Sequence, residues 1–498
     1  MQPDGPMSDT PPRDPAAPAP GAPGPAAAGW AGAPLRSTLA WLSVPALLAV
    51  AILALDLELP RPVLYAVAGA FGLLLLSRAF RDPELVLAAF VLYIPLKKMF
   101  VVPIAPGLNG TNGLEALMLL AWVVRASREG RPLLVTMPGS RLVGWWGAFA
   151  LLSVVTAGFR IGFGTVLSSN GPDLKLLLDH FIVFFAFLHL VRDGAMARRV
   201  VVYMMVGAVV VLGLGVREWL DKRWLSSIEK ARLLGPQRQP NDYGAFLVYS
   251  AGPFLALLLT QTRRVRAWLV APYLVVLAKM LLATFSRGAF VGVAVAGVAA
   301  GWLRGKWFLL GMGLLGAGLV AAMPQLIPES LAARMSQTTS TAGYEEELDA
   351  SSQTRLVLWK AAVDMTLESP LIGKGFKMFP RLKGQYTEMD VQESDNHNMF
   401  LYVASQMGVP ALIVFLWLLW RTYALGAGVY RSARDGFGRA IGMGGAAMVP
   451  GLVAVNMFGS RMVDIGVNAY FWVYLAVLAH LWRELEGEQG PAGAGGGP

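Results

Sequence analysis

Long apolar runs recur along this chain from about residue 38 to residue 482, and they constrain the fold more than any other feature. A helix needs roughly 20 apolar residues to cross the hydrocarbon core of a bilayer. Hydrophobic residues make up 55% of the chain and charged residues only 15%, whereas a soluble domain carries about 25% charged residues. These values exclude a disordered protein, a collagen-like fibre and an ordinary soluble enzyme. They predict an all-α, polytopic membrane helical bundle.

The apolar runs predict fourteen spans, of which the fourth is short, so we expect about 12–14 transmembrane helices. The predicted spans cover 38–57, 62–77, 84–101, 111–124, 142–158, 173–191, 200–216, 243–260, 267–285, 286–303, 307–323, 397–420, 440–458 and 466–482. Residues 1–34 are rich in Pro, Ala and Gly and predict a disordered tail, as do residues 485–498. Residues 35–484 then form one membrane domain, whose longest connection is 324–396.

Arginine-rich loops predict the orientation of the bundle. They lie near residues 78–81, 125–141, 192–199, 263–266, 304–306 and 421–439, which are alternate connections between the predicted spans. The positive-inside rule places these loops in the cytoplasm. Both termini are then cytoplasmic, and the longer segments 217–242 and 324–396 face outward.

The outward segment 324–396 contains a predicted helix from Arg355 to Glu368. Leu356, Trp359, Val363 and Leu367 fall on one stripe of that helix, and Ser369 with Pro370 ends it. We expect an amphipathic helix that lies at the outer membrane surface.

An outward-facing turn at Thr284–Gly288 interrupts the apolar stretch 267–303. Ser286 is a suitable N-cap for the next span, which places Arg287 in the first helical turn. A cation there opposes the helix dipole, so an anion such as a phosphate would compensate it. The alternative is an arginine that reaches the lipid headgroups. Lys279, two turns deeper, either binds the same anion or pairs with a carboxylate such as Asp179.

A second outward cluster contains Arg232 and Arg238, between Ala231 and the span at 243. Gly, Pro and Asn residues mark this segment as a turn that brings both arginines to the outer face. Juxtamembrane arginines are common, so this cluster alone is weak evidence for a site.

His397 differs from the other three histidines because it lies where a polar loop enters a span. His180, His189 and His480 lie inside apolar spans and are expected to be packed or hydrogen-bonded there. A histidine whose pKa is near neutrality is a natural general base. The alternative for His397 is a helix cap or a loop hydrogen bond.

Basic sites on one face together with one histidine predict an anionic, lipid-anchored substrate at the outer leaflet. A transporter is the main alternative, but its usual sign is broken or ionisable spans in two matching halves, and we find no internal repeat. The chain has no cysteine, so disulfides, thiolate metal sites and a cysteine nucleophile do not arise.

Three motifs make residues 200–460 resemble the O-antigen ligase and Wzy-type polymerase family of bacterial polysaccharide assembly. The first is Ser286-Arg287-Gly288 at the start of a span. The second is Arg355 and Trp359, followed in the same loop by Pro370, Gly373-Lys374-Gly375 and Phe379. The third is His397-Asn398, followed by Leu401 and Gly408. The segment containing Arg232 and Asn241 is also similar, whereas Gln406 stands where the family has an acidic residue.

The resemblance implies a GT-C-type membrane glycosyltransferase of the bacterial inner membrane that works at the periplasmic leaflet. Its donor would be an undecaprenyl-diphosphate-linked glycan, with no metal, other cofactor or nucleic acid required. His397 would act as the base. Arg287, together with Arg232, Arg238, Arg355 or Lys279, would bind the diphosphate.

The acceptor is not determined by the resemblance. We lean slightly to a polymerase that joins repeat units, because the long outer loop could hold a second, growing chain. The alternatives are a ligase that moves polymer to lipid A core or to protein, and a lipid-linked glycan exporter. Other polysaccharide-assembly proteins are possible partners.

Overall fold

The computed structural model describes residues 38, 61–100, 109–225, 227–322, 345–387 and 392–489. Every regular element in these ranges is helical, which confirms the predicted all-α fold. The principal helices are α2 (Arg61–Ala79), α3 (Pro83–Tyr93), α4 (Gly110–Arg128), α5 (Ser140–Ile161), α6 (Phe163–Leu190), α7 (Gly194–Lys222), α8 (Ile228–Ala231), α9 (Pro240–Thr260), α10 (Ala271–Ala283), α11 (Arg287–Arg304), α12 (Lys306–Ala322), α14 (Glu345–Glu368), α15 (Phe379–Leu382), α16 (Met399–Met407), α17 (Val409–Ser432), α18 (Gly436–Asn456) and α19 (Ile465–Gln489). Short 3₁₀ turns, η2 (Ile94–Leu96), η3 (Val265–Val270), η5 (Lys383–Gln385) and η6 (Arg461–Val463), extend or connect them.

Six helices of the described ranges are long and apolar enough to cross a bilayer, which confirms a polytopic helical membrane protein. They are α5, α7, α9, α17, α18 and most of α19. The search covers only the described residues, so the predicted total of 12–14 spans stays a prediction. Other predicted spans coincide with helices that are too short or too polar: α10 has 13 residues, and α6 carries Asp173, Lys175 and Asp179. The predicted span 38–57 lies, except for Thr38, outside the described residues, as does the tail 1–34.

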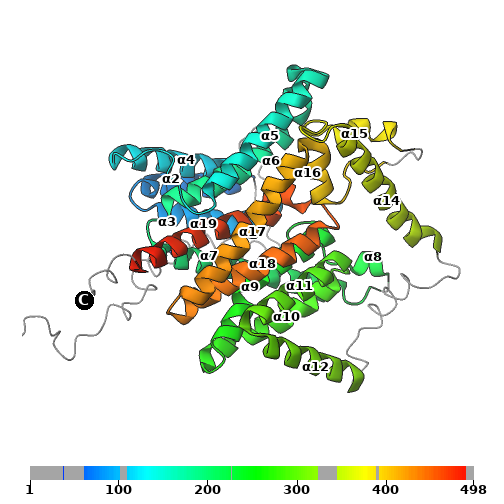
Figure 1. Ribbon diagram of the computed structural model, residues 1–498. Coiled ribbons are helices and arrows are strands. Elements are labelled where there is room, and N and C mark those ends of the chain that lie inside the picture. Colours follow the sequence, from blue (N-terminus) through cyan, green and yellow to red (C-terminus); the bar gives the residue numbers. More distant parts are fainter. Residues whose placement is uncertain are drawn as a thin grey trace, which may run out of the picture.

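The centre of the bundle is built on close contacts between small residues. A Cβ on Gly252 of α9 would lie 2.6 Å from the carbonyl oxygen of Gly444 in α18, and a Cβ on Gly442 would lie 2.3 Å from the backbone nitrogen of Tyr430 in α17. Small residues allow helix backbones to approach closely where apolar burial alone gives little specificity. These contacts fix α18 between α9 and α17, as Figure 1 shows.

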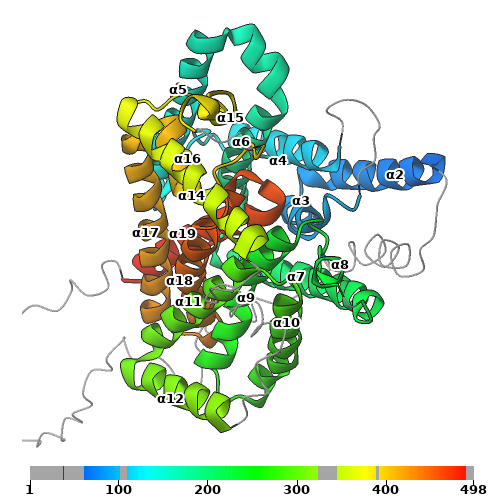
Figure 2. The ribbon, with the colours of Figure 1, turned by 90° about the vertical axis from the view of Figure 1, so that its right-hand side faces the viewer.

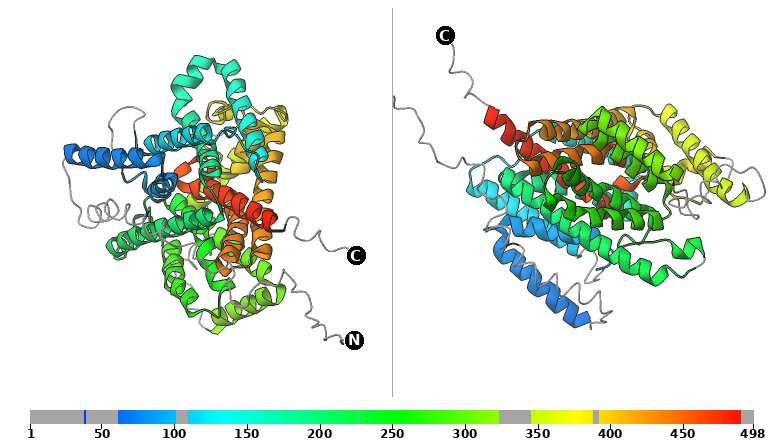
Figure 3. Two further views of the ribbon diagram at one scale, coloured as in Figure 1. Left: turned by 90° about the vertical axis from the view of Figure 1, so that its left-hand side faces the viewer. Right: turned by 90° about the horizontal axis from the view of Figure 1, so that it is seen from below.

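The arginine-rich loops meet at one end of the bundle. The Arg125 guanidinium donates to the carbonyl oxygen of Leu190 at 2.8 Å, and Arg198 pairs with Asp435 at 3.2 Å and Glu484 at 2.9 Å. These contacts join the connections that follow α4, α6 and α17 to the end of α19. Figure 3 shows this end, where the C-terminal end of α19 protrudes from the bundle. That this end faces the cytoplasm remains a prediction.

At the opposite end, α14 lies across the ends of the bundle helices (Figure 2). It begins earlier than predicted, at Glu345, and ends at Glu368 as predicted. Leu356 and Leu367 of the predicted apolar stripe are 62% and 73% exposed, whereas Leu358 and Met365 are buried. Leu356 and Leu367 therefore point away from the bundle, and a second apolar face of α14 packs against α16 and η5.

The predicted span 397–420 is two helices, because the chain breaks at Gly408. Gly408 has φ +90°, and a Cβ there would lie 2.4 Å from the carbonyl oxygen of Leu371. The Val409 amide donates to the Pro370 carbonyl at 2.7 Å. The loop after α14 thus packs against the junction of α16 and α17. Only glycine at position 408 leaves room for the backbone of this loop.

Candidate functional site

The turn between α10 and α11 holds Arg287 at the outer end of the bundle. Phe285 has φ +52°, and the Ser286 amide donates to the Thr284 hydroxyl at 3.2 Å. Ser286 occupies the N-cap position, as predicted, although its side chain makes no cap hydrogen bond. Arg287 is the first residue of α11, so its guanidinium adds positive charge to the positive end of the helix dipole.

Arg232 stabilises this turn through hydrogen bonds. Its Nε donates to the Thr284 carbonyl at 3.1 Å, and its Nη2 donates to the Asn241 side chain at 3.3 Å. Arg232 therefore ties the α10–α11 turn to the N-terminus of α9. Direct contact between Arg232 and a phosphate stays a prediction. The contacts in the structure show that Arg232 holds the α10–α11 turn in position.

Arg461, in η6, is a site residue that the sequence analysis missed. Its Nε donates to the Asn241 carbonyl at 3.2 Å, and its Nη1 donates to the Val455 carbonyl at 3.1 Å. Its guanidinium lies against Gly459, where a Cβ would come within 1.9 Å of Nη1. The sequence could have indicated Arg461, because it lies in a short loop predicted to face outward. The positive-inside rule gives no reason for an arginine in such a loop.

An ion-pair network supports the loop that carries Arg461. The Asp464 carboxylate contacts Lys97 Nζ at 2.8 Å and Lys98 Nζ at 2.7 Å. Lys98 also lies 3.8 Å from Asp242, which is 3.7 Å from Arg461 Nε. Although burial acts in the opposite direction, the two lysines hold the pKa of Asp464 well below its ordinary value. The network therefore stays charged at neutral pH and restrains Arg461.

Arg355, on α14, completes a cluster of three arginines with Arg287 and Arg461. Burial lowers the pKa of Arg355, and the nearby charges of Arg287 and Arg461 lower it further. Among the described residues, neither Arg287 nor Arg355 has a hydrogen-bond or ion-pair partner. Three like charges from three elements thus converge, and only Arg461 is partly neutralised, by Asp242. Such an arrangement favours a bound anion.

His397 lies beside this cluster in a constrained loop. Its φ is +54°, a left-handed conformation that costs energy for a residue with a side chain. The loop is held in place because Trp359 Nε1 donates to the Asn396 carbonyl at 2.9 Å and the Ser460 hydroxyl donates to Asp395 at 2.9 Å. The Asn398 side chain caps α16. Strain that neighbouring elements maintain is common at functional sites.

The electrostatic environment keeps His397 neutral. Burial lowers its pKa below the ordinary range, and the charges of Arg355 and Arg461 lower it further. The Asp395 carboxylate, 3.8 Å from Nδ1, acts in the opposite direction, as does Glu393. A neutral imidazole beside an anion-binding cluster can accept a proton.

No hydrogen bond or ion pair in the described ranges joins two other predicted site residues, Arg238 and Lys279, to the cluster. Arg238 is exposed, and its side chain has no hydrogen-bond or ion-pair partner in the described ranges. Lys279 Nζ lies 5.4 Å from the centroid of the Trp219 ring. The suggested partner of Lys279, Asp179, instead pairs with Lys175 at 2.7 Å.

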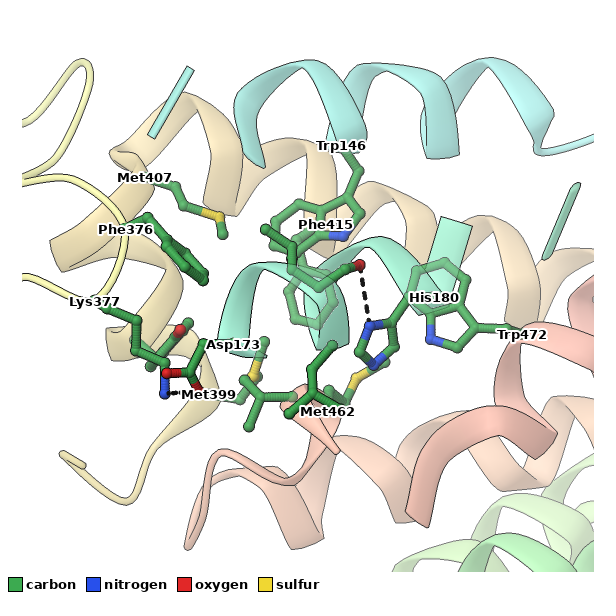
Figure 4. Close-up of a pocket in the computed structure, with 14 residues that line it drawn as sticks. Trp146, Asp173, His180, Phe376, Lys377, Met399, Met407, Phe415, Met462 and Trp472 are labelled. Carbon is green, nitrogen blue, oxygen red and sulfur yellow. Dashed lines mark hydrogen bonds and ion pairs between the residues drawn. The ribbon is translucent and has the colours of Figure 1, made fainter. Parts of the chain in front are cut away.

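A cavity of about 50 Å³ lies between residues of α5, α6, α16, α17 and α19 (Figure 4). Met399 and Met462, close in sequence to His397 and Arg461, line it together with Trp146, His180 and Trp472. Lys377 and Asp173, paired at 2.8 Å, lie at its edge.

The fold and the site define a polytopic helical membrane protein with a cationic, histidine-containing site at one end of its bundle. Residues 272–416 match the family model described as O-antigen ligase, which confirms the resemblance to that family. The matched range contains Arg287, Arg355 and His397, whereas Arg232 and Arg461 lie outside it. The match supports a membrane function of the O-antigen ligase or polymerase type and a glycosyltransferase-like activity. A search of curated proteins finds no significant match.

Proposed function

We propose that the protein is a GT-C-type glycosyltransferase that moves glycan from undecaprenyl diphosphate at the periplasmic leaflet of the bacterial inner membrane. The observation that carries the proposal is the convergence of Arg287, Arg355 and Arg461 beside His397. Three guanidinium groups, two of them without a partner in the described ranges, suit a diphosphate with several negative charges. In this orientation both termini are cytoplasmic.

The proposed reaction is a displacement at the anomeric carbon of the donor sugar. An acceptor hydroxyl attacks this carbon and gives its proton to His397, while the bond between the carbon and the diphosphate oxygen breaks. The leaving diphosphate takes the bonding electrons, and the three arginines stabilise its growing charge. Charges held in place before the reaction are usually the largest contribution to catalysis. The arginines supply the stabilisation that a metal ion supplies in other enzymes, so the mechanism needs no metal.

The acceptor distinguishes two forms of this proposal. We favour a polymerase that joins one lipid-linked repeat unit to another, because α14 and the loop after it lie over the site and offer a surface for a second glycan. A ligase that moves finished polymer to lipid A core or to protein would use the same residues.

The test is the size profile of lipid-linked and surface glycan in a deletion strain, compared with the same strain carrying the restored gene. A polymerase predicts that only single repeat units remain after deletion. Accumulation of full-length polymer on the carrier lipid would identify a ligase instead. If lipid-linked glycan fails to reach the periplasm while His397→Ala restores the wild-type profile, the protein is an exporter and the transferase proposal is wrong.

The pH dependence tests His397 as the base. Because the neutral imidazole is the active form, the rate is expected to fall as the pH drops through the lowered pKa of His397. Asp395→Asn removes a charge that raises this pKa, so the acid limb of the pH–rate profile is expected to move to lower pH. The measurement is the initial rate of transfer by purified protein between pH 4.5 and 8. An acid limb that moves to higher pH, or does not move, would contradict the assignment.

A further inference from the structure

A second basic site lies near the arginine-rich end of the bundle, away from Arg287 and His397. A groove of about 530 Å³ runs between the segment 136–142 and the middle of α17. Residues Arg141 and Leu142 of α5 form one wall, and Trp417, Trp420 and Arg421 of α17 form the other. The groove shares no lining residue with the cavity that Met399 and Met462 line.

The charge of this groove is not balanced by the protein. In the part of the chain that the structure describes, neither Arg141 nor Arg421 has a hydrogen-bond, ion-pair or cation–π partner, and no carboxylate lines the groove. At the same end of the bundle, Arg125 and Arg198 are both paired with acidic side chains. Two guanidinium groups that converge without a counterion call for an anion from outside the chain.

The remaining walls of the groove are apolar and face outward. Trp417 is 54% exposed and Trp420 is 60% exposed. Arg141 lies in the first turn of α5, one of the six membrane-length helices, so we expect it near the depth where a bilayer changes from headgroups to acyl chains. Tryptophan is enriched at that depth because its ring is apolar and its N–H is polar.

We propose that the groove binds an anionic phospholipid, with the lipid phosphate between Arg141 and Arg421 and an acyl chain along Trp417 and Trp420. Under the predicted orientation, this lipid belongs to the cytoplasmic leaflet. A phospholipid fits better than free phosphate because the two arginines lie beside exposed apolar side chains, Trp417 and Trp420, which could contact an acyl chain. The proposal does not depend on the transferase reaction, which is assigned to the other end of the bundle.

The experiment is a lipid titration of the full-length protein in detergent, followed by native mass spectrometry. Phosphatidylglycerol is the anionic probe, and phosphatidylcholine of the same acyl chains is the zwitterionic control. The double variant Arg141→Gln/Arg421→Gln is expected to bind the first phosphatidylglycerol roughly 10- to 30-fold more weakly, because each arginine near a membrane surface contributes to anionic lipid attraction. The matched control is Arg431→Gln/Arg434→Gln, which removes two exposed charges at the same end and is expected to change binding less than twofold.

Three results would overturn the proposal: equal affinity for the two lipids, unchanged binding by the double variant, or displacement of the lipid by millimolar inorganic phosphate. The last result would show a site for phosphate alone. Because loss of both charges could impair folding, Arg141→Lys/Arg421→Lys provides a second test. This variant keeps the charge and loses the bidentate geometry, so it is expected to bind phosphatidylglycerol with an affinity between those of the wild type and the glutamine variant.

Discussion

His397→Ala is expected to lower the rate of glycan transfer by roughly 10²–10⁴-fold, the usual contribution of a general base. The donor should still bind, because the arginines that hold the diphosphate remain. The effect is therefore expected in kcat more than in KM. The measurement is the initial rate with purified protein and lipid-linked donor, at donor concentrations that define both constants.

The backbone of His397 makes a second substitution necessary. Alanine is strained at φ +54°, whereas asparagine tolerates the left-handed conformation. His397→Asn is therefore expected to keep the loop intact and to be as inactive as His397→Ala. An asparagine variant with near-normal activity would show that position 397 serves the shape of the loop and not proton transfer.

Arg287→Lys is expected to lower kcat on the order of 10²-fold, the effect of removing one group that stabilises a leaving anion. Lysine keeps the positive charge but loses the planar guanidinium that contacts two phosphate oxygens at once. A loss of this size would show that geometry, and not only net charge, matters at the start of α11.

The control for Arg287 lies at the other end of the same helix. Arg304 is the last residue of α11, and its guanidinium lies 5.2 Å from the centroid of the Phe308 ring. Arg304→Lys changes the same chemistry in the same helix, far from the proposed site, and is expected to leave the rate unchanged. Equal losses in the two variants would assign the effect to folding or membrane insertion.

The sequence predicted most of the site because its residues lie in recognisable local contexts. Arg287 follows a turn that interrupts an apolar stretch, and His397 lies where a polar loop meets a span. Arg355 was found on the predicted outward helix. Arg461 was missed because its role depends on tertiary contacts with Asn241 and Val455, which no spacing in the sequence reveals. Lys279 was placed in the site by its depth, but its rotation about α10 brings it to Trp219.

The fold class was predicted correctly, whereas the break in the predicted span 397–420 was not. Hydropathy does not distinguish a membrane-spanning helix from a short apolar helix inside the bundle, such as α3 with 11 residues. Nor does it reveal the break at Gly408, which depends on the carbonyl of Leu371 approaching from a loop that ends α14. The three other histidines behave as predicted, since His180, His189 and His480 each hydrogen-bond a backbone carbonyl within the bundle.

The position of Arg355 on α14 has a mechanical consequence. Arg287 and Arg461 belong to the bundle, whereas Arg355 belongs to a helix that lies across its end. Repulsion among the three like charges opposes the packing of α14 against the bundle. When a diphosphate is bound, each arginine is attracted to its negative charge, so the net electrostatic interaction between α14 and the bundle becomes attractive. A bound donor diphosphate would therefore hold α14 against the bundle. Release of the carrier diphosphate after transfer would weaken the contact between α14 and the bundle again.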